Sequence, residues 1–174
     1  MSSRRPFVVS IATLRHRAER VARVDCQGVI PDLEVAGTRV PEGSEVTLEA
    51  LLEVVQGGVL VSGTVGTSWE AQCRRCLEMT QGQVRVRVRE LFTPQASPHD
   101  EDVYPLAGDQ LDLEPLARDA VLLELPLAPL CSEGCRGLCP VCGVDRNRVA
   151  CGCVNEQLDP RWAGLDVLRR GGPS

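Results

Sequence analysis

Apolar and polar residues alternate over several stretches of the chain, which is the pattern of a half-buried β-strand. Between residues 46 and 54 every second side chain is apolar, and this period of two places the apolar set on one face. After a glycine turn at residues 56–58, a second strand is predicted for residues 59–73. The most regular alternation lies at residues 83–89, where valines alternate with glutamine and arginines. These segments predict an antiparallel sheet built from hairpins.

Other segments predict shorter or helical elements. Asp112 is a suitable helix N-cap, Pro115 is tolerated in the first turn, and Pro126 ends the apolar helical stripe that follows. The further expected elements are a strand at 7–11, two helical turns at 14–21, a hairpin bend at 76–82, an acidic loop at 94–105 and a helix at 159–168.

The expected fold class is α+β: an antiparallel sheet with hairpins and a few packed helices, followed by a C-terminal Cys-rich segment that resembles a zinc knuckle. We divide the chain into an α+β core domain at residues 1–125, and a Cys-rich metal-binding segment with a C-terminal helix at residues 126–174.

Composition narrows the class of protein. A chain of 174 residues with 43% apolar content can bury one hydrophobic core. No 18-residue apolar run and no signal-peptide pattern occur, so we expect a cytoplasmic protein without a membrane partner. All 19 basic residues are Arg, a bias that indicates a bacterium with a GC-rich genome.

Charge is unevenly distributed and limits how nucleic acid can bind. The formal net charge is −5, and residues 90–125 hold nine acidic side chains against one Arg. Phosphate would be repelled by the whole molecule, so any contact must come from a local basic face. Arg85, Arg87 and Arg89 are candidates for RNA contact, because alternate strand residues put three guanidiniums on one face. The alternative is a solvated surface on which glutamates of the earlier strand, at residues 45–53, neutralise them.

Six of the nine cysteines lie between residues 131 and 153, and their spacing predicts a metal site. Two cysteines with two residues between them on a tight turn can both bind one tetrahedral zinc ion. A second pair, after eight more residues, can supply the other two of its four ligands. The preferred ligands are Cys139, Cys142, Cys151 and Cys153. In one alternative, Cys131 or Cys135 replaces one of the last pair. In another, a second site recruits Cys73 and Cys76, whereas Cys26 is expected to be an ordinary buried residue. An all-sulfur set leaves no open position, so we expect structural Zn²⁺.

Cys73 and Cys76 also permit a different function. Arg74 and Arg75 between them would lower a thiol pKa and activate a dithiol redox pair. Redox pairs of the thioredoxin type lie at the N-terminus of a helix, however, whereas strands are expected both before Cys73 and after Cys76. A cysteine-based redox or metal-sensing protein is therefore the alternative function.

The sequence contains no arrangement typical of an active site. His16 and His99 have no cysteine, serine or carboxylate neighbours in a catalytic pattern, and no phosphate-binding, dinucleotide or zinc-protease motif occurs. We therefore predict that the protein is not an enzyme and has no small-molecule substrate.

Several segments together resemble the YceD family, which is linked to accumulation of the large ribosomal RNA. They are Gly58-Val59-Leu60-Val61, Cys73-Arg74-Arg75-Cys76-Leu77-Glu78, Arg89-Glu90-Leu91-Phe92, Leu125-Pro126-Leu127-Ala128-Pro129-Leu130-Cys131, Gly137-Leu138-Cys139-Pro140-Val141-Cys142-Gly143 and Asp159-Pro160-Arg161-Trp162. The resemblance implies a non-catalytic factor in large-subunit ribosome biogenesis and 23S rRNA accumulation. It implies ribosomal RNA or a ribosome assembly protein as the partner, and it supplies no catalytic residues.

Overall fold

The protein is built around one long antiparallel sheet. A computed structural model describes residues 5–12, 14, 20–96, 103–154 and 161. The central strand is β6 (Gly58–Gln72), which pairs along one edge with β7 (Met79–Thr93) and along the other with β5 (Val46–Val55). These are the three segments whose alternation is clearest in the sequence, and the prediction of antiparallel hairpins there is confirmed.

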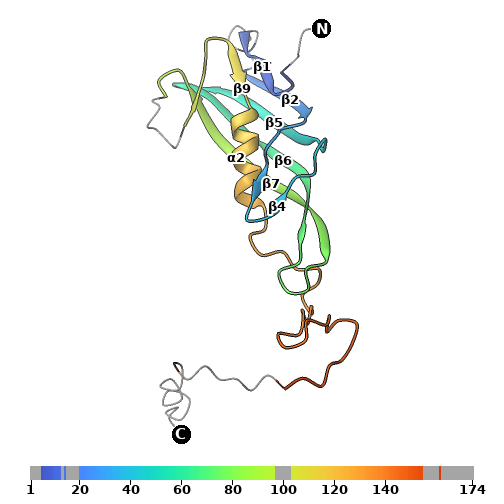
Figure 1. Cartoon of the computed structure of the whole chain (residues 1–174). Helices are drawn as coiled ribbons and strands as arrows, with labels where there is room; N and C mark the ends of the chain where they lie inside the picture. The colour runs from blue at the N-terminus through green and yellow to red at the C-terminus, as the bar shows by residue number, and fades with distance from the viewer. Residues whose placement is uncertain (1–4, 13, 15–19, 97–102, 155–160, 162–174) are drawn as a thin grey trace.

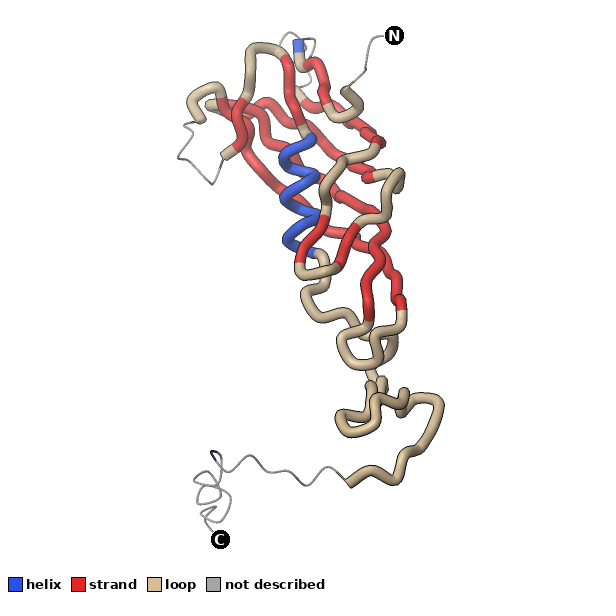
Figure 2. The backbone as a smooth tube through the Cα atoms, in the orientation of Figure 1, coloured by secondary structure: helices blue, strands red, loops and turns tan. Residues whose placement is uncertain are grey.

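Shorter strands extend this sheet (Figures 1 and 2). Strand β2 (Val21–Gly28) pairs with β5, and the hairpin of β3 (Glu34–Val35) and β4 (Thr38–Arg39) joins β6 beyond the end of β5. Strand β8 (Tyr104–Pro105) is parallel to the end of β7. A separate two-stranded ribbon pairs β1 (Val8–Ser10) with β9 (Gln110–Asp112).

One face of the sheet is covered and holds the core. Helix α2 (Glu114–Glu124) packs on β6 and β7 and buries Leu116, Ala117, Ala120 and Val121. The inward residues of β5 and β6 meet it together with Phe7 and Phe92, and the largest side chains in this core are at most 1% exposed. The opposite face carries the polar set of the alternation, which leaves it open to solvent.

Helix α2 begins one residue later than a cap at Asp112 would place it. The N-cap is Leu113, whose side chain makes no capping bond, and the Asp112 carboxylate instead accepts a hydrogen bond from the N–H of Glu114 at 3.0 Å. Asp112 therefore still satisfies a free helical donor, from one position further out. The helix stops at Glu124 before Pro126, as predicted.

The expectation of a few packed helices overstates the helical content. Within the described ranges, α2 is the one helix whose full length is seen, and the rest of the ordered core is sheet. Most of the predicted helical turns at 14–21 lie outside the described residues, and Val21 already belongs to β2. The predicted helix at 159–168 also lies outside them, apart from Arg161. The α+β class holds in a sheet-rich form, with cysteine clusters in the C-terminal part.

No helix in the described parts of the chain combines the length and the apolar character needed to cross a bilayer.

Candidate metal centres

Eight of the nine cysteines form two groups of four, and all nine are free thiols. In each group the four Sγ atoms lie within 4.8 Å of one another. We call the first group the clamp cluster; it consists of Cys73, Cys76, Cys131 and Cys135. We call the second group the tail cluster; it consists of Cys139, Cys142, Cys151 and Cys153.

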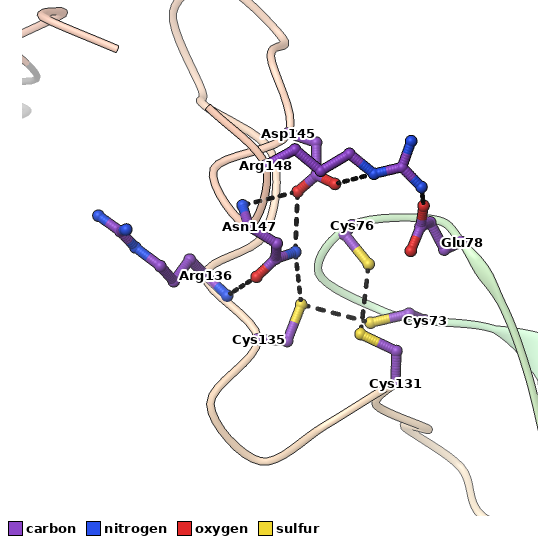
Figure 3. A network of polar contacts seen from close by, with 9 residues as sticks. All are labelled: Cys73, Cys76, Glu78, Cys131, Cys135, Arg136, Asp145, Asn147 and Arg148. Atoms are coloured by element: carbon purple, nitrogen blue, oxygen red, sulfur yellow. Dashed lines mark hydrogen bonds and ion pairs between the residues drawn. The ribbon is translucent and has the colours of Figure 1, made fainter. Parts of the chain in front are cut away.

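The clamp cluster joins two distant parts of the chain. Cys73 and Cys76 lie on the tip of the β6–β7 hairpin, whereas Cys131 and Cys135 follow helix α2 (Figure 3). Three of the four are buried, and Cys131 is exposed. The four sulfurs point toward one another from both sides of this contact (Figure 3).

The sulfur spacing of the clamp cluster fits a tetrahedral ion. Four bonds of about 2.3 Å to zinc require sulfur–sulfur distances of about 3.8 Å. The distance from Cys73 Sγ to Cys135 Sγ is 3.8 Å, and that from Cys76 Sγ to Cys131 Sγ is 3.5 Å. Both are far longer than a disulfide bond of about 2.05 Å. A thiophilic divalent ion is therefore the ligand that this arrangement suits.

Hydrogen bonds to main-chain carbonyls hold the segment after α2 against strand β4 and the hairpin tip. The buried hydroxyl of Thr38 donates to the carbonyl of Pro126 at 2.7 Å, and the N–H of Arg74 donates to Pro129 at 2.9 Å. The guanidinium of Arg75 donates to the carbonyl of Cys135 at 2.9 Å. The clamp cysteines are thus positioned by contacts that do not themselves involve a metal.

The two Cys-x-x-Cys turns have the same backbone hydrogen bonds. In the clamp cluster, the N–H of Leu77 donates to the carbonyl of Cys73 at 3.0 Å, and the N–H of Cys73 donates to Glu78 at 2.8 Å. In the tail cluster, Gly143 and Cys139 make the equivalent bonds, at 2.9 and 2.8 Å. The two turns lie in different parts of the fold but have the same knuckle geometry. In each, this geometry lets two cysteines bind one metal ion.

The tail cluster is local and more exposed. Its four ligands come from a single stretch of 15 residues, and only Cys139 is buried. A cavity of about 280 Å³ lies beside Cys139, Cys151 and Cys153, and Arg136 and Arg146 contribute to its lining. Solvent and small molecules can therefore reach this cluster more easily than the clamp cluster.

One thiol in each cluster is readily ionised. Hydrogen bonds from the backbone N–H groups of Cys142 and Val141 lower the pKa of Cys139 to about 6, although burial opposes this. Burial also raises the pKa of Cys73, but backbone N–H groups, that of Cys131 foremost, outweigh it and lower the value to about 6. A thiolate is the form that binds metal, so each site has a preferred first ligand.

At least one other thiol in each cluster resists ionisation without a cation. The N–H of Glu78 favours the thiolate of Cys76, but desolvation and the three neighbouring sulfurs outweigh it and raise the pKa of Cys76 to about 12. The neighbouring sulfur of Cys142 is the main cause that raises the pKa of Cys153 to about 12. Four thiolates at this spacing repel one another, and a divalent ion at the centre would remove that repulsion.

A polar network connects the loop of the tail cluster to the clamp cluster (Figure 3). The side-chain amide of Asn147 donates to Cys135 Sγ at 3.4 Å, and its oxygen accepts from the N–H of Arg136 at 2.7 Å. Asp145 orients Asn147 and pairs with Arg148, which also contacts Glu78 on the hairpin. Asn147 thus contacts a clamp sulfur although it lies between the tail ligands in sequence.

The structure brings the preferred ligands, Cys139, Cys142, Cys151 and Cys153, into one group, and it places Cys131 and Cys135 with Cys73 and Cys76. This arrangement corresponds to the two-site alternative. Cys26 lies apart from both clusters in the hydrophobic core. Asn147 was not anticipated from the sequence, because a single asparagine between cysteines carries no signal of its contact with a distant sulfur.

The predicted arginine ladder lies on the open face of the sheet. Arg85, Arg87 and Arg89 are exposed on β7, and none forms an ion pair with another described residue. Strand β6 separates them from β5, so their direct cross-strand neighbours are Gly66, Thr64 and Ser62. These arginines form no pair with the glutamates at residues 45–53 in the described structure, so the solvated surface and the RNA contact both stay predictions.

The fold and the clusters define a class of protein: a β-sheet protein whose Cys-rich segment is tied to the sheet by a four-sulfur group. The family model for the large ribosomal RNA subunit accumulation protein YceD matches residues 61–169. The chain belongs to this family, which confirms the resemblance found in the sequence.

Individual relatives extend this result. An uncharacterized protein of Mycobacterium tuberculosis is 41% identical over 131 residues, covering 72% of this chain and 63% of the relative. One from Mycobacterium leprae is 33% identical over 172 residues, covering 94% and 78%. The chloroplast YCED homolog 1 of Arabidopsis thaliana, named as a large ribosomal RNA subunit accumulation protein, is 32% identical over 66 residues, covering 38% and 21%. This chain thus spans less than two thirds of the Mycobacterium tuberculosis relative. No solved structure matches the chain.

Proposed function

We propose that this protein is a non-catalytic, cytoplasmic factor in large-subunit ribosome biogenesis that supports accumulation of 23S rRNA. Membership of the YceD family supports a role in large-subunit ribosome biogenesis. The two four-cysteine clusters support a structural, non-catalytic role for the metal. In this proposal one Zn²⁺ ion binds in each cluster, and the clamp ion holds the Cys-rich segment at 126–174 to the core domain at 1–125. The arginines of β7 contact ribosomal RNA.

Zinc suits both sites because four cysteine sulfurs at tetrahedral spacing are its preferred structural ligands. Such a set leaves no coordination position for water or substrate, so it supports folding and not Lewis-acid catalysis. The ions would join the hairpin tip to the chain after α2 and would close the loop from Cys139 to Cys153.

Several features support RNA as the partner. Three exposed guanidiniums on alternate residues of β7 are spaced about 6.6–6.8 Å apart, and guanidinium is a good bidentate donor to phosphate. The acidic residues of the 90–125 segment would repel RNA, so they favour a partner other than RNA at that part of the surface. A basic ribosomal protein or assembly factor could bind this side while RNA binds β7.

The alternative redox function has less support. The backbone places Cys73, which is fully buried, against the sulfurs of Cys131 and Cys135. A dithiol that exchanges with partner proteins needs an accessible nucleophile. Alkylation separates the two functions: rapid labelling of Cys73 in the native zinc protein supports redox exchange, and protection until a chelator is added supports the structural site.

The proposed function is tested by gradient fractionation of cell extracts. We expect the wild-type protein to sediment with large-subunit precursors and its depletion to lower 23S rRNA. The triple variant R85E/R87E/R89E should neither sediment with precursors nor restore the rRNA. For a matched charge change, the single variant Arg89→Glu is compared with Arg23→Glu, which lies on the same face but three strands away and should still sediment with precursors. If wild-type protein stays in the soluble fractions and its depletion leaves 23S rRNA unchanged, the proposal is wrong.

A further inference from the structure

The open face of the sheet separates positive from negative charge across a floor of small side chains. Four successive outward residues in the middle of the central strand β6 are small: Ser62, Thr64, Gly66 and Ser68. On one side of them stand the arginines of β7, and on the other stand Glu49 and Glu53 of β5. The registers align Glu49 with Thr64 and Thr64 with Arg87. Glu49 and Arg87 therefore face each other across two strand spacings, about 9.6 Å.

A hollow runs across these strands. It has a volume of about 340 Å³, and its lining includes Thr47 and Glu49 of β5, Thr64 and Gly66 of β6, and Arg85 of β7. Gly66 contributes to its depth, because this residue places no side chain above the strand. The volume is at the lower end of the range for small-ligand sites, and the hollow is open at the surface.

The charges on both sides are available for a ligand. The described structure gives Arg85, Arg87 and Glu49 no ion-pair or side-chain hydrogen-bond partner among its residues. In the described structure these opposite charges, two strands apart, form no ion pair with each other. A ligand that presents anionic groups to β7 and hydrogen-bond donors to β5 would satisfy both.

We propose that this hollow reads bases of a single-stranded RNA, with phosphates on the arginines of β7 and a base lying across β6 toward Glu49. This inference rests on the proposed function and deepens it. A carboxylate accepts hydrogen bonds from the amino group of cytosine, and it repels the carbonyl oxygen that uracil has at the same position. Glu49 would thus select bases with an exocyclic amino group, and the arginines would supply affinity without selection.

Oligo(C) and oligo(U) RNAs of equal length test this selection. Cytosine has an amino donor at C4 and an acceptor at N3, whereas uracil has a carbonyl at C4 and an N–H donor at N3, so the pair tests which edge group faces Glu49. With the zinc-loaded full chain, fluorescence anisotropy at fixed salt should show oligo(C) bound about five-fold more tightly than oligo(U). Glu49→Gln should bring this ratio close to one, because an amide can donate to uracil as well as accept from cytosine.

Two variants make the test specific. Glu53→Gln removes the same charge from the same face of β5 but lies opposite Leu60, outside the hollow, so it should keep the preference for oligo(C). Arg87→Glu should weaken binding of both RNAs to a similar extent and reduce the dependence of affinity on salt.

Each outcome has a distinct meaning. If wild type binds both RNAs equally, or if Glu49→Gln and Glu53→Gln change the ratio alike, base reading by Glu49 is wrong while RNA binding by β7 stands. If Arg87→Glu leaves both affinities unchanged, the arginine contact of the proposed function fails as well. If the chain binds neither RNA and instead self-associates through this face, a second copy is the occupant and the inference is overturned.

Discussion

The two cysteine clusters use the same ligands and the same knuckle turn but differ in what they connect. The clamp cluster joins residues that are at least 55 positions apart in the chain and is mostly buried. The tail cluster closes a loop of 15 residues and is mostly exposed. Closing a longer loop removes more conformational entropy from the unfolded chain. Position in the fold, and not ligand chemistry, should therefore set how much each ion stabilises the protein.

Loss of a clamp ligand should have the largest effect. Cys76→Ser removes a buried ligand, and we expect the zinc content measured by native mass spectrometry to fall from two ions to one. The free energy of unfolding should fall by at least about 3 kcal/mol, because binding energy at a structural zinc site is folding energy. Chemical denaturation of the purified variant measures this loss.

The matched control for this comparison is Cys142→Ser in the tail cluster. It should also remove one zinc ion but should lower the free energy of global unfolding by less than about 1 kcal/mol, since its loop is not part of the sheet. If Cys76→Ser does not yield folded protein, Cys131→Ser tests the same ion through an exposed ligand. Equal losses for clamp and tail variants would show that position in the fold has no influence.

Zinc release should separate the clusters by rate. With excess chelator, the wild-type protein should release zinc in two phases whose rates differ roughly ten-fold or more, because the buried site needs a larger opening than the exposed one. A colorimetric zinc indicator follows both phases. The fast phase should be absent in Cys142→Ser and the slow phase absent in Cys131→Ser. A single phase carrying both ions would contradict the distinction.

The strands that could be predicted from the sequence are those with one fully buried face. Strands β5, β6 and β7 alternate clearly because their inward side chains fill the core beneath α2. Strand β2 was not predicted, since it lies at the edge of the sheet and only Cys26 among its residues is buried. An edge strand with half-exposed alanine and valine positions lacks the contrast that periodicity requires.

The four cysteines of the tail cluster could be grouped from the sequence because they lie within one loop, where spacing limits geometry. The clamp ligands remained one of several alternatives for a physical reason. Cys73 and Cys131 come together only because the β6–β7 hairpin and helix α2 end at the same place, and spacing along the chain does not contain that information. The sequence therefore predicted a metal site but could not pair the distant cysteines.

The contact of Asn147 with Cys135 should have an intermediate effect. Asn147→Ala removes an amide donor to a clamp sulfur, and contacts of this kind typically change metal affinity by about 10- to 100-fold. Competition with a chelator of known affinity, read on the slowly released ion of protein with both clusters intact, reports the clamp ion. Asn147→Asp keeps the acceptor for Arg136 but places a carboxylate beside a thiolate, so it should weaken binding at least as much. Ser132→Ala, between Cys131 and Cys135 and without a side-chain bond among the described residues, should leave the affinity unchanged.

The smallest effect should come from the residue that follows each Cys-x-x-Cys pair. Both adopt the left-handed backbone region, with φ of 62° at Leu77 and 73° at Gly143. This region costs a residue with a side chain about 1–2 kcal/mol, whereas glycine enters it freely. Gly143→Ala should therefore lower the stability of the tail loop by about 1 kcal/mol, although open space surrounds the added methyl group.

Leu77→Gly should have the opposite sign. Relief of the backbone strain is partly offset by the greater freedom of glycine in the unfolded chain, which leaves a net gain of about 0.5 kcal/mol. The Leu77 side chain is 56% exposed, so its removal should cost little packing. Denaturation of the zinc-loaded variant measures the sign. A loss above about 1 kcal/mol would show instead that the leucine side chain stabilises the hairpin tip, and the two knuckles would then differ in packing as well as in position.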